Sequence, residues 1–150
     1  MFVTKMKFLR LNLNKQQLRS IHFQSVSNFL EYFSSLTNQT IQNQIIKLLN
    51  DYFNDIKEKN YDLNQNESNA IFDLYIAKIG IYYNVELHFK VYMRLKWALF
   101  IGLNLDLLLL IFGVLSKIWF IPVVTLIFTG YMLYLNMFYK KRNKIYGFEI

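Results

Sequence analysis

The longest apolar stretches of the chain lie in its C-terminal third. One covers Trp97–Leu115 and the other Ile118–Tyr139, with only Ser116 and Lys117 between them. As helices that rise about 1.5 Å per residue, each would cross a hydrocarbon layer about 30 Å thick. The pattern therefore predicts a transmembrane helical hairpin with spans of about 97–115 and 118–139.

The first 93 residues contain apolar positions at helical spacing. Three- and four-residue intervals predict one helix over about Lys15–Leu36, capped by Asn14, and a second beginning after Thr40. A polar connection rich in Asn then leads to a third helix, expected to start near Ser68 or Asn69. Two or three such amphipathic helices would pack into a small bundle.

Two segments alternate apolar and polar residues with a period of two. Over Phe8–Asn14 this pattern predicts a short strand. Residues 85–94 alternate as well, but no Pro or Gly interrupts Ile81–Ile101, so a helix continuing into the first apolar stretch is the preferred interpretation. A strand over 85–94, paired with residues 8–13, stays open as the alternative.

These patterns predict a mainly α integral membrane protein. The expected parts are a cytoplasmic-side domain over 1–93, a hairpin with basic flanks over 94–144, and a tail over 145–150. Whether the first domain contains a two-stranded element is undecided at this point. Basic residues lie before the first span and after the second, whereas the turn between them has only Lys117. This asymmetry predicts that both termini lie on the cytoplasmic side of an inner membrane, or on the matrix side in an organelle. The expected topology anchors are Arg94, Lys96, Trp97, Lys140, Lys141 and Arg142.

Charge and composition exclude several functional classes. The net charge is +7, but most of the excess of basic residues flanks the apolar stretches, which argues against nucleic acid as a partner. The chain has no cysteine and only two histidines, His22 and His88, far apart in sequence. We therefore expect no thiolate or histidine metal site, no cofactor and no catalysis by this chain alone.

Asp106 is the most unusual residue of the apolar stretches, because it lies at the middle of the first one. Helical spacing gives each predicted span a polar stripe, and we expect Asp106 to bind Thr125 or Thr129 across the hairpin or a subunit boundary. Helix packing, ion or proton passage, and pairing with a basic group of a partner remain alternative roles for Asp106. The stripes contain Gly102, Asp106 and Gly113 on one helix and Thr125, Thr129 and Asn136 on the other.

Three basic residues gather near the start of the first predicted helix. Arg10, Lys15 and Arg19 form either an ordinary charged surface or a contact for a small anionic ligand such as a nucleotide.

The sequence favours a non-enzymatic integral membrane protein. Its cytoplasmic helical domain would bind a partner or signal. Its hairpin would contact the lipid bilayer and self-associate into a homo-oligomer. One version of this hypothesis is an effector that permeabilises the membrane. The alternative is a small structural subunit of a larger respiratory, transport or secretion complex, in which partner membrane subunits would cover the hairpin.

Overall fold

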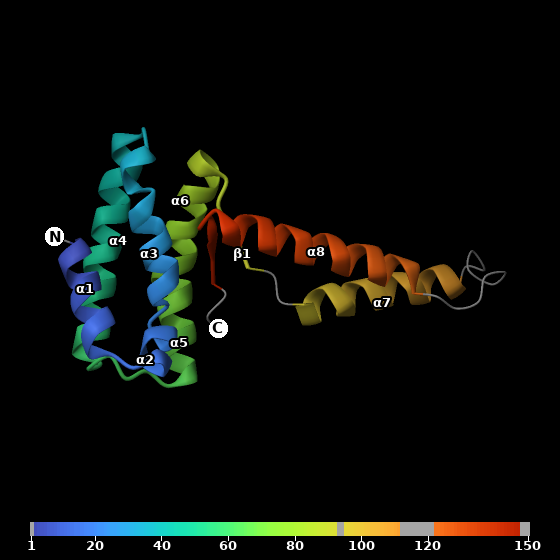
Figure 1. The fold of residues 1–150 in the computed structure, drawn as a ribbon, viewed down its shortest axis with the longest axis horizontal. Coiled ribbons are helices and arrows are strands. Elements are labelled where there is room, and N and C mark those ends of the chain that lie inside the picture. The colour runs from blue at the N-terminus through green and yellow to red at the C-terminus, as the bar shows by residue number, and fades with distance from the viewer. Residues whose placement is uncertain (1, 93–94, 112–121, 148–150) are drawn as a thin grey trace. The chain divides into compact units, whose positions relative to one another are not determined.

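The computed structural model describes residues 2–92, 95–111 and 122–147, which are mainly helical (Figure 1). The chain divides into two compact units. Unit 1 consists of Met1–Val91 together with Asn143–Ile150, and unit 2 is Tyr92–Arg142. Of the tail predicted over 145–150, the described residues 145–147 therefore lie in the same unit as the N-terminal helices.

The first helix, α1, spans Phe2–Asn12. The short strand predicted over Phe8–Asn14 is therefore wrong. Leu9 is 2% exposed whereas Leu11 is 84% exposed, although alternation in a strand would put both on the same face. Met6 and Leu9, three residues apart on one face of the helix, are buried in the core of unit 1.

The helix predicted over Lys15–Leu36 is interrupted. Its start is confirmed, because the Asn14 side chain accepts a hydrogen bond from the backbone N–H of Gln17 at 2.9 Å and caps α2, Lys15–Ser20. The chain then turns at His22, whose φ of 56° is left-handed. The next elements are α3, Phe23–Glu31, and the short 3-10 helix η1, Phe33–Ser35.

The long helix α4 spans Gln39–Glu58. Its cap is Asn38 rather than the expected Thr40, and the Asn38 side chain accepts hydrogen bonds from the N–H groups of Thr40 and Ile41. The residues at three- and four-residue spacing form the buried face of the helix, as the periodicity predicts. They are Ile45, Leu49, Tyr52, Phe53 and Ile56.

The third predicted helix begins a few residues early and contains an irregular turn. Asn64 caps α5, Gln65–Ile71, and the side chain of Glu67 completes the capping box. A π-helical turn, η2, Phe72–Ile76, then leads into α6, Ala77–Leu87.

Neither interpretation of residues 85–94 describes the structure. The helix α6 ends at His88, which has a left-handed φ of 58°. The two residues of β1, Lys90–Val91, then pair in parallel with β2, Ile145–Tyr146. The partner strand thus comes from the far end of the chain and not from residues 8–13.

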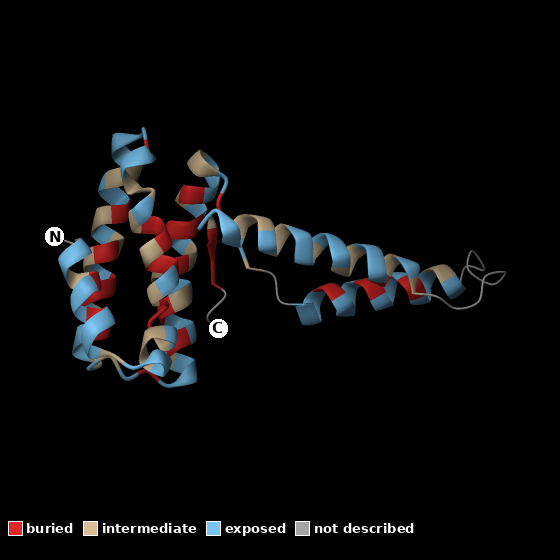
Figure 2. Cartoon of the chain, in the orientation of Figure 1, coloured by how far each residue is buried: buried red, intermediate tan, exposed pale blue. Residues whose placement is uncertain are grey.

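The C-terminal strand is held in unit 1 by side chains of α3. The Asn28 amide donates to the carbonyl oxygen of Ile145 at 2.8 Å, and the N–H of Gly147 donates to the hydroxyl of Ser25 at 3.0 Å. The Tyr146 ring lies over Gly80 and packs at an angle of 49° against the Phe29 ring, with 5.6 Å between the ring centres. Figure 2 shows the buried residues concentrated where these elements meet.

Unit 2 is a pair of antiparallel helices, α7, Leu95–Ile111, and α8, Val123–Lys141, which lie side by side (Figure 1). The α7 helix has 17 residues, so its length is about 26 Å and falls short of the roughly 30 Å of a hydrocarbon core. The α8 helix has 19 residues, but these include Thr125, Asn136 and the basic residues at its C-terminal end.

The predicted transmembrane hairpin is therefore not supported. No helix formed by the described residues is long and apolar enough to cross a membrane. The same finding argues against the two-pass integral membrane class and the inner-membrane location. The prediction equated the length of an apolar stretch with the length of a helix, and part of both expected spans, 112–121, lies outside the described residues.

Candidate functional site

The structure brings Asp106 of α7 to the first turn of α8. The Asp106 carboxylate accepts hydrogen bonds from the backbone N–H groups of Val124 and Thr125, at 3.0 and 2.8 Å, and from the Thr125 hydroxyl at 2.6 Å. The N–H groups of a first helical turn have no partner within their own helix, and a carboxylate there interacts favourably with the helix dipole. Asp106 thus caps a helix to which it does not belong.

The environment of Asp106 favours its charged form. Asp106 is buried, and this burial by itself works to raise the pKa of the carboxyl group. The hydrogen bonds from Thr125 and Val124 oppose that effect and hold the pKa of Asp106 below its ordinary value. The ionised Asp106 carboxylate already accepts hydrogen bonds from these donors. Its role in the hairpin is therefore to hold the two helices together.

The two helices of unit 2 approach each other closely beside this cap. Ala98, Gly102 and Asp106 are the buried residues of α7, and their four-residue spacing places them on one stripe. A Cβ atom at Gly102 would lie only 2.6 Å from the Thr125 Cα. The stripe predicted from helical spacing is therefore the contact face between α7 and α8, where Gly102 permits the close approach.

The other residues of the predicted polar stripes have different environments. Thr129 is half-buried, and among the described residues its hydroxyl has no hydrogen-bond partner. Asn136 is half-buried near the other end of α8. Gly113 lies outside the described residues. Thr125 and Thr129 were both expected to contact Asp106, and the Thr125 hydroxyl is the one that donates a hydrogen bond to it.

The remaining surface of unit 2 is apolar on nearly all sides. Among the described residues, eleven large apolar side chains of α7 and seven of α8 are between 39% and 71% exposed. Leu107 and Leu108, adjacent in sequence, are both among them. Helices that are apolar all round are found buried within larger structures, and exposed patches of this extent mark interaction sites.

The expected anchor residues lie at one end of the hairpin. Lys96 and Trp97 belong to the first turn of α7, and Lys140, Lys141 and Arg142 are at the end of α8. The Arg142 guanidinium lies 3.9 Å from the centre of the Phe138 ring. Arg94 lies outside the described residues. These residues make one end of the hairpin strongly basic, the end where α7 begins and α8 ends.

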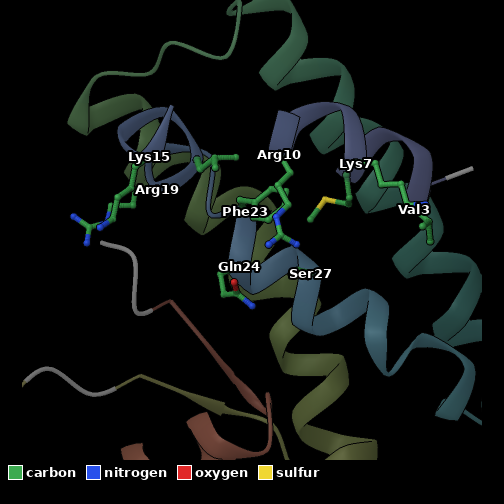
Figure 3. Close-up of a pocket in the computed structure, with 10 residues that line it drawn as sticks. Val3, Lys7, Arg10, Lys15, Arg19, Phe23, Gln24 and Ser27 are labelled. Carbon is green, nitrogen blue, oxygen red and sulfur yellow. The ribbon is translucent and has the colours of Figure 1, made fainter. Parts of the chain in front are cut away.

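A second candidate site lies in unit 1, where Arg10, Lys15 and Arg19 line one pocket. Figure 3 shows that Lys15 and Arg19 lie together on α2, while Arg10 extends from α1 over α3. The sequence analysis missed Lys7, which lines the same pocket from α1. Its three-residue spacing from Arg10 would have identified it if this segment had been recognised as a helix.

The histidines do not form a metal site in the described structure. The residues that the structure describes contain no group of three or more His, Cys, Asp or Glu side chains placed to hold a metal ion. His22 is buried, and its Nε2 lies 3.0 Å from the carbonyl oxygen of Ser68. Burial lowers the pKa of His22, and the hydrogen bond with Ser68 partly opposes this change.

Comparison with known proteins gives no relative. No protein-family model, no curated protein and no solved structure matches the chain. The functional argument therefore rests on the residues and geometry described above.

Proposed function

We propose that this chain is a non-enzymatic assembly protein whose α7–α8 hairpin binds the same hairpin of a second copy. The observation that carries the proposal is the exposed apolar surface of unit 2. Among the described residues from Trp97 to Tyr139, Asp106 is the single charged side chain, and it is buried and capped. A neutral apolar surface meets an identical surface without charge repulsion.

The area of this surface is more than a stable interface requires. The eighteen described large apolar side chains are each 39–71% exposed, so together they present well above about 800 Å² of apolar surface. A standard protein interface buries about 800 Å² on each partner. A second copy of the hairpin would therefore bury one apolar face of unit 2 in an interface of standard size.

The charges at the hairpin's end favour one orientation of the two copies. Lys96, Lys140, Lys141 and Arg142 all lie at the end where α7 begins and α8 ends. Parallel hairpins would bring these basic ends together. A two-fold arrangement with antiparallel hairpins separates them and gives the self-complementary contact typical of homodimers.

The test is the mass of the purified chain in solution, measured by size exclusion with light scattering. A monomer has a mass of 18.1 kDa, and we expect a multiple of this value. Glutamate at both Phe100 and Ile127, which are 61% and 67% exposed, should convert the assembly to monomers. Glutamate at both Ile81 and Val85, which are 59% and 70% exposed on unit 1, is the matched control and should leave the mass unchanged.

Two results would overturn self-association. One is a wild-type chain that is monomeric at micromolar concentration. The other is an assembly whose mass is equally insensitive to the paired glutamates and to the control. Stoichiometric co-purification of a different protein with the monomer would instead favour the role of a subunit in a larger complex.

A further inference from the structure

The pocket of unit 1 formed by α1, α2 and α3 has the size of a small-molecule site. Its volume is about 540 Å³, within the range of about 300–1,000 Å³ that is usual for ligand pockets. Lys7 and Arg10 line it from α1, and Lys15 and Arg19 line it from α2. Polar side chains of α3, Gln24 and Ser27, complete the lining (Figure 3).

The positive charge of this pocket is not compensated by acidic residues. The first 30 residues of the chain contain five basic residues and no acidic one, although unit 1 as a whole is rich in carboxylates. Within the described structure, none of the four basic side chains of the pocket forms an ion pair, and no acidic residue lines it. Like charges held on neighbouring turns destabilise a helix. A bound anion would remove that repulsion.

The same lining also contains apolar side chains. Met6 is buried, and Leu18 and Phe23 are half-buried where they line the pocket. A small inorganic anion would leave these side chains uncovered, whereas a ligand with an apolar or aromatic portion would contact them. Arginine is well suited to phosphate because its planar guanidinium offers paired N–H donors.

We propose that this pocket binds a small molecule that carries several phosphate charges and an aromatic portion, the chemistry of a nucleoside polyphosphate. The phosphates would lie between Arg10 and the Lys15–Arg19 pair, and the aromatic portion would pack on Phe23 and Leu18. The site belongs to unit 1 alone, so it does not depend on self-association of the hairpin.

The first experiment measures binding of three probes to the full chain at low salt by calorimetry and by the shift in melting temperature. The probes are ATP, tripolyphosphate and adenosine. ATP should bind and raise the melting temperature, because a ligand that binds only the folded state stabilises it. Tripolyphosphate should bind more weakly than ATP, adenosine should not bind measurably, and added salt should weaken ATP binding.

Paired substitutions then locate the site. R10Q/R19Q should weaken ATP binding by about tenfold or more, because each lost charge-assisted hydrogen bond is worth about a factor of ten. K47Q/K78Q removes the same charge from exposed positions of α4 and α6 and should leave the affinity nearly unchanged. Circular dichroism checks that both variants are folded.

Several results would overturn the proposal. They are no binding of ATP by the wild type, equal affinity for adenosine and ATP, and equal loss of affinity in the two paired variants. A single-stranded oligonucleotide that binds in proportion to its length while ATP does not bind would also overturn it, in favour of a nucleic-acid surface. The oligomeric mass is measured separately, so failure here leaves the assembly proposal untouched.

Discussion

The Asp106 carboxylate binds both the backbone N–H and the hydroxyl of Thr125, at 2.8 and 2.6 Å. One acidic side chain of α7 thereby satisfies the start of α8 and fixes the contact between the two helices. Because the charged form of Asp106 accepts these bonds, the integrity of unit 2 should depend on pH.

The pH dependence has a defined sign. The pKa of Asp106 lies below its ordinary value of 3.8 in the folded chain, so its contribution to stability is complete above that value and is lost as the pH falls through the folded-state pKa. The protection factors of the α8 amides, which correct for the slower intrinsic exchange in acid, should therefore fall as the pH decreases below 3.8. D106N, which cannot ionise, should lose this part of the dependence. An unchanged acid response in D106N would contradict the assignment.

Gly102 should tolerate no larger side chain. Because a Cβ atom there would lie 2.6 Å from the Thr125 Cα, G102A should force α7 and α8 apart and destabilise unit 2 by about 1–3 kcal/mol. Gly130 on α8 has no neighbouring atom within 4 Å of such a Cβ, so G130A should be neutral or stabilise by about 0.5–1 kcal/mol. Urea unfolding of both variants, followed by tryptophan fluorescence, makes the comparison, because the two tryptophans of the chain, Trp97 and Trp119, both belong to unit 2. Equal effects would contradict the close approach at Gly102.

Acid should also weaken unit 1 through His22. Its pKa in the folded chain lies below the ordinary 6.5, so between these values the unfolded state binds more protons. The free energy of unfolding should therefore fall as the pH decreases below 6.5 and level off below the folded-state pKa. Urea midpoints between about pH 7 and pH 5 measure this. H22N should flatten the dependence of the urea midpoint on pH, and asparagine tolerates the left-handed conformation of this position. An equal pH dependence in H22N would show that another group causes it.

The core of unit 1 contains a hydroxyl whose loss should be measurable. Tyr83 is fully buried, and its hydroxyl donates to the carbonyl oxygen of Phe29 at 2.5 Å. Y83F should lower the free energy of unfolding by about 1 kcal/mol. Tyr82 is half-buried, and within the described residues its hydroxyl forms no hydrogen bond, so Y82F is the control. Denaturant titration should separate the two variants, and identical midpoints would contradict the role of the Tyr83 hydroxyl.

Local patterns were enough to predict much of unit 1. The Asn14 cap and the buried face of α4 follow from capping residues and from helical periodicity, which act within a few residues of one another. The breaks at His22 and His88 were not predictable in this way. Both residues adopt a left-handed φ without a Gly or Pro to announce it, and packing of the surrounding core sets their conformation.

The strand pairing and the hairpin show the limits of local patterns more clearly. The partner of Lys90–Val91 lies more than fifty residues further along the chain, so no nearby residue specifies it. The pairing of Asp106 with Thr125 was expected from helical spacing, but its donors include backbone N–H groups because α8 begins only after Pro122. Proline at the start of a helix is a known signal, and it was overlooked.

The pairing of β1 with β2 determines how the chain can be dissected. Ending the chain before unit 2 would also delete Tyr146, which is 7% exposed in the core of the other unit, and would leave Gly80 facing an empty space. Removing residues 92–142 from within the sequence would keep that core whole, provided that the replacement linker is long enough to let β2 run parallel to β1. For protein engineering, the hairpin is therefore an insertion between two segments of unit 1 that can be exchanged as one piece.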